Sequence, residues 1–425
     1  MADAIHTTCP YCGVGCGILA TYRDGILSVA GDPDHPANRG RVCVKGAALG
    51  ETIGLENRLL EPRIGGIPSS WDQALDAVAE AFTKTIAAHG PEAVAFYVSG
   101  QLLTEDYYVA NKLMKGFIGS ANIDTNSRLC MSSSVAGHTR AFGSDTVPGN
   151  YEDLEQADLV VLAGSNMAWC HPVLFQRIET AKAARPEMRV VVVDPRRTTT
   201  ADAADLHLAL RPGSDAVLFN GLLAHLDAVG AIDRNYVVRY CAGLDAALEA
   251  ARRSPEAARA CDLASEDVAT FFDWFARTKR TVTLYSQGIN QSTSGTDKVN
   301  AIINCHLATG RIGWPGMGPF SLTGQPNAMG GREVGGLANQ LAAHMGFDDD
   351  ARDRVGRFWG APRLACGPGL KAIELFQAVA SGRVKAVWIM ATNPAFSLPE
   401  TDLVRRALGG CDFVAVSDCM QRTDT

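Results

Sequence analysis

The chain has 425 residues, with 39 Lys and Arg against 46 Asp and Glu, and its formal net charge is −7. This length predicts about two or three domains, and 47% hydrophobic with 20% charged residues excludes disordered, collagenous and coiled-coil chains. No stretch approaches the roughly 18 consecutive apolar residues of a membrane span. The pI near 5.7 argues against nucleic acid as a partner.

The amino terminus lacks the basic region, apolar core and twin arginine of an export signal, so we expect a cytoplasmic protein. In that reducing compartment the twelve cysteines are not expected to form a disulfide framework. Eight of them are scattered singly, which is typical of small buried hydrophobic side chains. The other four lie in the first tenth of the chain and need a different explanation.

This cluster consists of Cys9, Cys12, Cys16 and, after 26 further residues, Cys43. A proline and two glycines separate the first three, which predicts a tight loop whose sulfurs converge on one point. Four thiolates suit tetrahedral zinc or an iron–sulfur cluster. Zinc sites usually pair two Cys-x2-Cys motifs, whereas here one such motif precedes a wider gap and a distant cysteine, which favours a [4Fe–4S] cluster. By composition alone, Lys45 is a solvated surface lysine.

The rest of the chain alternates short apolar runs with helical patterns, which predicts βαβ units and a doubly wound α/β architecture. The expected buried parallel strands are Ala93–Val98, Leu159–Ala163, Val190–Val193, Val282–Tyr285, Val384–Met390 and Phe413–Val416. The expected helices are Trp71–His89, Asp106–Gly116, Pro172–Ala184, Ser214–Val229 and Lys371–Ser381.

All six strands end in small or polar residues, and the carboxyl ends of parallel strands are where such folds bind ligands. Together these loops indicate a long, polar ligand. The turn at Gly164 offers backbone N–H groups at a helix start, where a pyrophosphate is favoured, and Asp194 ends the next strand, where an acid can bind a ribose. The Gly-x-Gly-x-x-Gly fingerprint is absent, so NAD is not indicated. We expect the glycine-rich stretch Gly310–Gly336 to be a packed irregular loop lining a ligand cavity.

These motifs resemble the molybdopterin oxidoreductases, and within them the catalytic subunits of bacterial assimilatory nitrate reductases. The resemblance runs from Thr8 to the last residue, in the family's order and spacing. It is carried by the four clustered cysteines with Lys45, by Asn126-Ser-Arg-Leu-Cys130-Met131, by Gly164-Ser-Asn-Met-Ala168 with His171-Pro172, and by Gly324-Gln-Pro-Asn327 with Arg332-Glu-Val-Gly335.

The resemblance implies a [4Fe–4S] cluster and a molybdenum bis(molybdopterin guanine dinucleotide), abbreviated bis-MGD. Cys9, Cys12, Cys16 and Cys43 match the cluster ligands, Cys130 matches the molybdenum ligand, and Lys45 matches a lysine between cluster and pterin. Arg128 and Arg332 are candidates for attracting the substrate anion. The remaining implied cofactor-binding positions are Gln101, Asn126, Gly164, Ser165, Asn166, His171, Asp194, Gly213, Asp215, Gln287, Gln291, Asn393, Ser417 and Asp418.

The resemblance also implies an organisation and a reaction. We expect a [4Fe–4S] domain at 1–58, a molybdopterin-binding domain in two segments (59–145 and 316–425), and a Rossmann-like MGD-binding domain at 146–315. The implied reaction is the reduction of nitrate to nitrite. A flavin-containing reductase subunit, a ferredoxin or a flavodoxin would supply the electrons.

Two alternatives compete with this reaction. Formate dehydrogenase shares the fold and cofactors, but its metal ligand is typically followed by a histidine that can accept a proton, whereas Met131 follows Cys130 here. The other alternative is a partial chain acting only as an iron–sulfur electron carrier. Family chains continue past Thr425, so we expect the carboxy-terminal part of the family fold to be missing.

Overall fold

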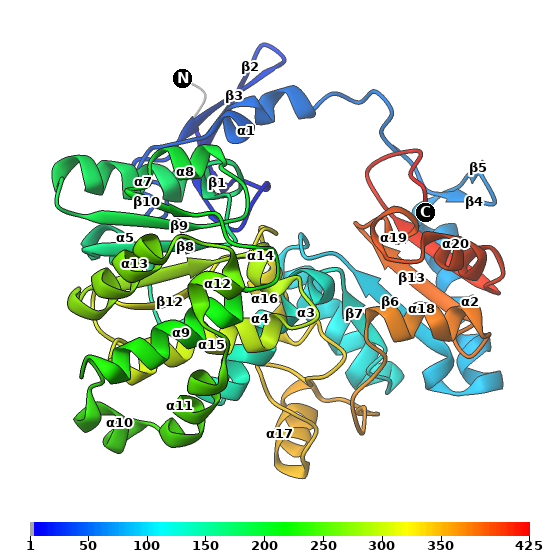
Figure 1. The fold of residues 1–425 in the computed structure, drawn as a ribbon. Helices are drawn as coiled ribbons and strands as arrows, with labels where there is room; N and C mark the ends of the chain where they lie inside the picture. Colours follow the sequence, from blue (N-terminus) through cyan, green and yellow to red (C-terminus); the bar gives the residue numbers. More distant parts are fainter. Residues whose placement is uncertain (1–3) are drawn as a thin grey trace. The chain divides into compact units, whose positions relative to one another are not determined.

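The computed structural model describes residues 4–425 (Figure 1). Within them the chain forms two compact units. Unit 1 contains the residues up to Gly50 and Cys130–Gly324, and unit 2 contains Glu51–Leu129 and Gln325–Thr425. None of the helices in residues 4–425 has the length and apolar character to cross a membrane.

Unit 1 opens with a small antiparallel sheet. Its strands β1 (Ile5–Thr8), β2 (Gly17–Arg23) and β3 (Ile26–Gly31) lie side by side in sequence order. The register pairs Thr8 with Gly17, so that the loop carrying the first three cysteines leaves and re-enters the sheet at one place. The short helix α1 (Val44–Ala47) follows, with Cys43 as its N-cap residue.

The main sheet of unit 1 has five parallel strands in the order β10-β9-β8-β11-β12. The chain winds outward from β8 in one direction and then resumes at β11 on the other side of β8. This places a topological switch point between β8 and β11, where doubly wound folds bind ligands. The strands are β8 (Leu159–Ala163), β9 (Arg189–Val193), β10 (Leu206–Leu208), β11 (Thr281–Tyr285) and β12 (Gly318–Ser321).

Helices cover both faces of this sheet (Figure 1). Alternate residues of β8 belong to two separate apolar clusters: Leu159 and Val161 to one, Val160 and Leu162 to the other. The all-apolar sequence of β8 is thereby explained by burial on both faces. The helices of unit 1 are α4 (Ser127–Phe142, begun in unit 2), α5 (Tyr151–Gln156), α6 (Met167–Cys170), α7 (Pro172–Ala184), α8 (Thr199–Asp202), α9 (Asp215–Ala228), α10 (Arg234–Tyr240), α11 (Leu244–Arg253), α12 (Ala257–Cys261), α13 (Ser265–Arg277), α14 (Gln287–Asn290) and α15 (Gly295–Ala308).

Unit 2 contains a four-stranded parallel sheet in the order β14-β13-β6-β7. Its strands are β6 (Val94–Val98), β7 (Ile123–Thr125), β13 (Ala386–Met390) and β14 (Phe413–Ser417), with a second switch point between β6 and β13. A small hairpin of β4 (Arg63–Ile64) and β5 (Ile67–Pro68) precedes them. The helices are α2 (Trp71–His89), α3 (Thr104–Lys112), the π-helix η3 (Leu113–Ile118), α16 (Ala328–Val334), α17 (Asp349–Trp359), α18 (Ala372–Ala380), α19 (Pro394–Ser397) and α20 (Thr401–Gly409).

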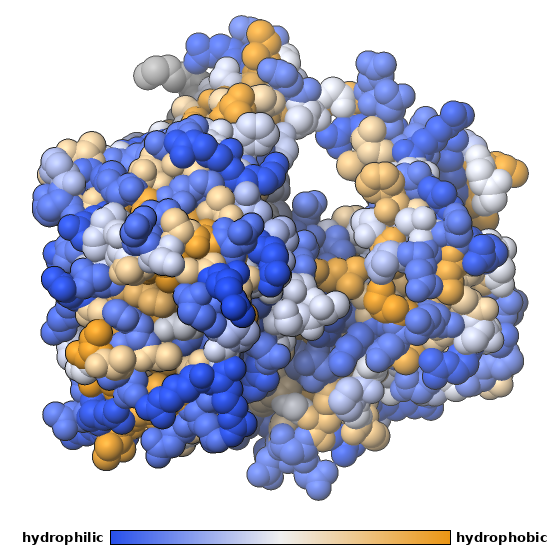
Figure 2. All heavy atoms as spheres, in the orientation of Figure 1, coloured by the Kyte–Doolittle hydropathy of each residue, from blue (hydrophilic) through white to orange (hydrophobic). Residues whose placement is uncertain are grey.

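The structure confirms the predicted α/β class and all six predicted strands within a few residues. The expectation of a wholly irregular loop over Gly310–Gly336 is wrong, because β12 and α16 both lie inside it. Its glycines surround these elements in turns, for example Gly316 and Gly335, which both have positive φ. Hydrophilic residues dominate the visible surface in Figure 2, with hydrophobic residues in small separate patches.

Candidate functional site

The four clustered cysteines line one cavity in unit 1. Cys9, Cys12, Cys16 and Cys43 face it together with the first residues of α7. Cys9 N donates to Cys16 O at 2.8 Å, which closes the loop between β1 and β2. The convergence predicted from the spacing is therefore present in the fold.

Burial controls the protonation of these thiols. It raises the pKa of Cys9 and Cys12 and raises the pKa of Cys16 to about 12, and the neighbouring thiolates add to these increases. The positive charge of Lys45 opposes the increase at Cys9 and Cys12. Without metal the thiols of Cys9, Cys12 and Cys16 are thus protonated near neutral pH, and a bound metal has to displace these protons.

The arrangement fits an iron–sulfur cluster. The four thiols stand around a shared cavity, as the four-cysteine ligation of a [4Fe–4S] cluster requires.

Lys45 is half-buried and lies within electrostatic reach of two groups. Its Nζ donates to Trp169 O at 3.5 Å. Its charge acts on the thiols of Cys9 and Cys12 and also on the imidazole of His171. It is therefore not the isolated surface lysine that composition alone would suggest.

Two glycines meet at the switch point of the main sheet. Gly164, which follows β8, has φ of +55°, and Gly288 in α14 donates from its backbone N to Gly164 O at 3.0 Å. A Cβ added to Gly164 would lie 2.8 Å from the backbone of Gly288. Only glycine permits this approach, which explains part of the motif that begins at Gly164.

Next to this contact lie buried polar atoms that have no partner within residues 4–425. They include Ser165 Oγ, His171 Nδ1 and Thr323 Oγ1. His171 Nε2 lies 2.6 Å from Thr323 O, and burial lowers the pKa of His171, so we assign a neutral ring that donates from Nε2. Buried polar groups are normally hydrogen-bonded, and these three atoms suit a polar ligand at the switch point.

The other predicted positions of unit 1 have varied surroundings. Asp194 Oδ1 accepts from Arg196 N at 2.9 Å. Asp215 forms a buried ion pair with Lys298 at 2.7 Å, so its carboxylate already has a partner. Sequence reasoning missed Lys298, although a lysine within the apolar pattern of α15 signals a buried partner. Asn166 Oδ1 accepts from Thr200, Gly213 has φ of +89°, and Gln291 is exposed.

The thiol of Cys130 lies on the first turns of α4. Gln287 Nε2 donates to Cys130 Sγ at 3.5 Å, and the side-chain amide of Asn290 donates to Cys130 O. Gln287 was predicted as a cofactor position, whereas Asn290 was missed. Met131, which follows Cys130, is buried.

In unit 2 the side chain of Asn126 joins the loops that follow β6 and β13. Its Oδ1 accepts from Gly100 N at 2.8 Å and from Gln325 Nε2 at 2.7 Å, and its Nδ2 donates to Thr392 Oγ1 at 3.0 Å. Gln101 next to this network is exposed. The network lies at the switch point of the unit 2 sheet and was only partly expected from the sequence.

Arg128 and Arg332 are the two arginines that are candidates for attracting a substrate anion. Arg128 donates twice to Asp124, at 2.9 and 3.0 Å, and once to Asn339 Oδ1 at 2.6 Å. Its guanidinium is therefore already bonded to neighbouring side chains. Arg332 is buried in α16 and contacts Met329 Sδ.

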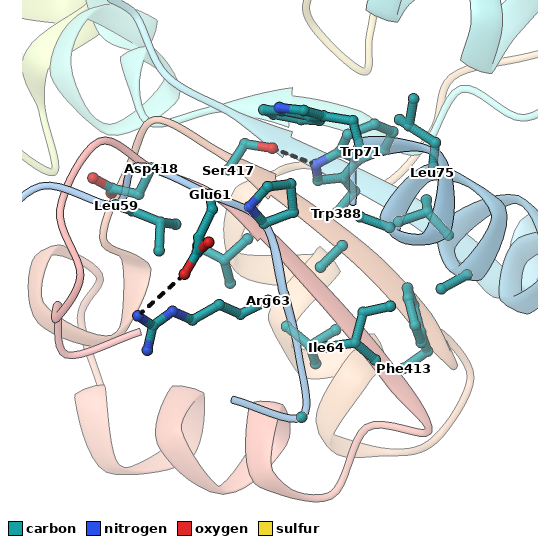
Figure 3. A pocket seen from close by; sticks show the side chains of 18 of the residues that line it. Leu59, Glu61, Arg63, Ile64, Trp71, Leu75, Trp388, Phe413, Ser417 and Asp418 are labelled. Atoms are coloured by element: carbon teal, nitrogen blue, oxygen red, sulfur yellow. Dashed lines mark hydrogen bonds and ion pairs between the residues drawn. The ribbon is translucent and has the colours of Figure 1, made fainter. Parts of the chain in front are cut away.

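The last three predicted positions lie near the end of the described chain. Asn393 Nδ2 donates to Asp424 Oδ2 at 3.0 Å. Ser417 and Asp418 line a groove between α2, the preceding hairpin segment and β14, which has a volume of about 370 Å³ (Figure 3). Apolar side chains, including Trp71 and Trp388, form much of its wall, and Trp388 Nε1 donates to Ser417 Oγ at 2.9 Å.

Comparison with protein families gives two matches that together span nearly the whole chain. Residues 3–54 match the molybdopterin oxidoreductase Fe4S4 domain, and residues 61–425 match the molybdopterin oxidoreductase family.

Individual relatives agree with these matches. A nitrate reductase of Klebsiella oxytoca is 59% identical over 99% of this chain and 48% of its own length. A nitrate reductase of Shewanella frigidimarina is 49% identical over 100% of this chain and 46% of its own length. A periplasmic nitrate reductase of Desulfovibrio desulfuricans is 39% identical over 95% of this chain and 56% of its own length. The chain thus spans about half the length of these relatives. Acetylene hydratase from Pelobacter acetylenicus has the same fold, with a TM-score of 0.78 at 19% identity, over 98% of this chain and 60% of that one.

Proposed function

Because the chain belongs to the molybdopterin oxidoreductase family and carries the Fe4S4 domain of that family, we propose that the protein reduces nitrate to nitrite. The family match confirms the predicted [4Fe–4S] cluster and molybdenum–molybdopterin cofactor. The observation that carries the choice of nitrate is the similarity over the whole chain to proteins named nitrate reductases, from several bacteria.

Electrons enter through the cluster in this proposal. Cys9, Cys12, Cys16 and Cys43 bind it, in agreement with their shared cavity. Lys45 connects the cluster with the pterin, and its electrostatic reach toward both the cysteines and His171 supports that role. A half-buried cation there favours the more negative, reduced state of the cluster.

The molybdenum is held as bis-MGD in this proposal. When bound, it supplies a centre that accepts an oxygen atom and changes its oxidation state by two electrons. The unpaired atoms of Ser165 and His171 support a polar ligand at the unit 1 switch point. The proposed cofactor contacts in unit 1 are Gly164, Ser165, Asn166, His171, Asp194, Gly213, Asp215, Gln287 and Gln291, and in unit 2 Gln101, Asn126, Asn393, Ser417 and Asp418.

Cys130 is the proposed protein ligand of the metal. Gln287 and Asn290 hold its thiol and its carbonyl group, which orients the side chain before any cofactor binds. The thioether of Met131 cannot accept a proton, which favours nitrate over formate as substrate. Arg332, a buried cation in α16, is the proposed group that attracts nitrate, whereas the guanidinium of Arg128 is bonded to Asp124 and Asn339.

The proposal includes a cellular setting. The reaction serves nitrate assimilation in the cytoplasm, with a flavin-containing reductase subunit, a ferredoxin or a flavodoxin as electron donor. The resemblance of the sequence motifs to assimilatory enzymes supports it. The domain arrangement of 1–58, 59–145 with 316–425, and 146–315 belongs to the same proposal.

The decisive variant is Cys130→Ala in the full-length protein, purified without oxygen. We expect nitrate reduction with reduced methyl viologen to fall by at least about 10³-fold, because the metal loses its protein ligand, while iron content stays unchanged. Cys170→Ala, which removes an exposed cysteine, serves as the control and keeps activity. Undiminished turnover by Cys130→Ala contradicts the proposal, and formate oxidation in place of nitrate reduction would reassign the substrate.

A further inference from the structure

A buried asparagine connects two of the segments that carry the clustered cysteines. Asn38 is fully buried, and its Oδ1 accepts from Gly17 N at 2.8 Å. Its Nδ2 donates to Gly17 O at 2.9 Å and to Arg41 O at 2.7 Å. Gly17 follows Cys16 directly, and Arg41 precedes Cys43 by two residues. One side chain thus binds the backbone beside two of the four cysteines.

The turn after Asn38 is strained. Arg39 and Gly40 have φ of +48° and +81°, and Arg41 N donates to Asn38 O at 3.0 Å. Positive φ at both central positions is the pattern of a type I′ turn, and the left-handed conformation costs a non-glycine residue about 1–2 kcal/mol. Such a turn persists only where other contacts determine it. The bond from Asn38 Nδ2 to Arg41 O is such a contact, since it holds the far end of the same turn.

A buried arginine of α7 holds the residues that precede Asn38. The side chain of Arg177 is 2% exposed, and its Nη1 donates to Pro36 O and Ala37 O, both at 3.0 Å. Its Nε donates to Glu155 Oε1 at 2.6 Å, so the guanidinium is fixed from the other side by α5. The segment from Pro36 to Arg41 is therefore held at both ends by buried side chains.

We propose that Asn38 is a positioning residue for the iron–sulfur cluster, which fixes the spacing between the backbones of Cys16 and Cys43 while Arg177 holds its segment against α7. All three side-chain bonds of Asn38 go to these cysteine-bearing segments. The inference rests on the proposed ligand role of the four cysteines. Outer-shell groups that orient ligands typically change metal affinity by about 10–100-fold when they are mutated.

The test uses the full-length protein purified without oxygen. Iron and acid-labile sulfide per chain, the rate of iron loss to a chelator, and the EPR spectrum and midpoint potential of the reduced cluster are measured in Asn38→Ala and Asn38→Asp. We expect iron to leave Asn38→Ala at least about tenfold faster, with a shifted potential in the cluster that remains. Asn38→Asp loses iron faster still, because it places a buried carboxylate, which accepts but does not donate, against the carbonyl oxygens of Gly17 and Arg41.

Asn220→Ala is the matched control. Asn220 is a partly buried asparagine of unit 1, and its Nδ2 donates to Ser254 Oγ at 3.0 Å, within the helical part of the unit. We expect its iron content, EPR spectrum and potential to equal those of the wild type. An effect of Asn38→Ala no larger than that of Asn220→Ala overturns the proposal.

Two further variants keep the outcomes separate. Where Asn38→Ala yields no folded protein by circular dichroism, Arg177→Met decides: faster iron loss supports the proposal, and unchanged retention overturns it. Cys43→Ser tests the ligand assignment itself. If Cys43→Ser keeps all its iron and potential, the ligand assignment fails; if it loses iron while Asn38→Ala does not, only the role of Asn38 fails.

Discussion

The two parallel sheets differ in how the polar side chains near their carboxyl ends are hydrogen-bonded. In unit 1, Ser165 Oγ, His171 Nδ1 and Thr323 Oγ1 are buried without a partner in residues 4–425. In unit 2, the amide of Asn126 is bonded at both its oxygen and its nitrogen, to groups that include Gly100 N. The loops at the first switch point thus carry several unsatisfied groups, whereas the loops at the second are joined by an internal network, although the hydroxyl of Tyr97 in β6 also lacks a partner in residues 4–425.

This difference indicates two ways of preparing a ligand site. An unpaired buried polar group costs about 1–3 kcal/mol, which a ligand that supplies the missing hydrogen bond can offset. A ligand that binds at the unit 1 switch point therefore stabilises the protein more than one that binds at the unit 2 switch point. The network around Asn126 instead fixes its loops in advance, so that a ligand meets a surface that is already ordered.

The strongest test addresses the close approach in unit 1. We expect Gly164→Ala to lower the free energy of unfolding by about 3 kcal/mol or more, because the new Cβ meets the backbone of Gly288 and φ is positive. Urea unfolding followed by circular dichroism measures it. Gly409→Ala in α20, where an added Cβ meets nothing within 4 Å, is the control and should be neutral or slightly stabilising. Equal effects of the two substitutions would show that the switch point tolerates a side chain.

A pair of substitutions compares the two sheets directly. Asn126→Ala leaves Gly100 N and Thr392 Oγ1 without a partner, and we expect a loss of about 2 kcal/mol in the unfolding free energy of cofactor-free protein. Ser165→Ala removes an atom without a partner, so stability should hold or rise while molybdenum content falls. A destabilised Ser165→Ala with normal molybdenum content would remove the contrast between the sheets.

The smallest expected effect is on the pH dependence of stability. Burial lowers the pKa of His171 and His306, and both lie in unit 1. The folded state keeps these rings neutral, whereas the unfolded state binds protons below a pKa of about 6.5, so stability is full above that pH and is lost as pH falls. We expect a slope of up to about 1.4 kcal/mol per pH unit for each histidine. His306→Gln should reduce the slope between pH 6.5 and 5; an unchanged slope would exclude His306 as a contributor.

The sequence was informative where one physical signal dominated. Leu159–Ala163 matches β8 at both ends, because an apolar run of this short length that contains β-branched residues favours a strand buried on both faces over a helix. Pro172 marks the first residue of α7, since its fixed φ and missing N–H suit that position. The spacing of the cysteines predicted their convergence because the first three are only a few residues apart.

The sequence did not predict the elements and roles that depend on contacts between residues far apart in the chain. The helix α4, which carries Cys130, was not predicted, because its many serines favour turns and caps over helix interiors. The strand β12 is hidden in glycine-rich sequence and is defined by its pairing with β11. The roles of Asn38 and Arg177 depend on hydrogen bonds to residues distant in sequence. Nothing in the sequence around either residue indicates these bonds.

The groove beside β14 contains two tryptophans whose fluorescence depends on what the groove holds. Trp71 and Trp388 stand in its wall, and Trp388 is hydrogen-bonded to Ser417, one of the proposed cofactor contacts. Indole fluorescence depends on the polarity and hydrogen bonding around the ring. Filling this groove would therefore change the emission of these two tryptophans, so that binding there can be followed in real time without an added label.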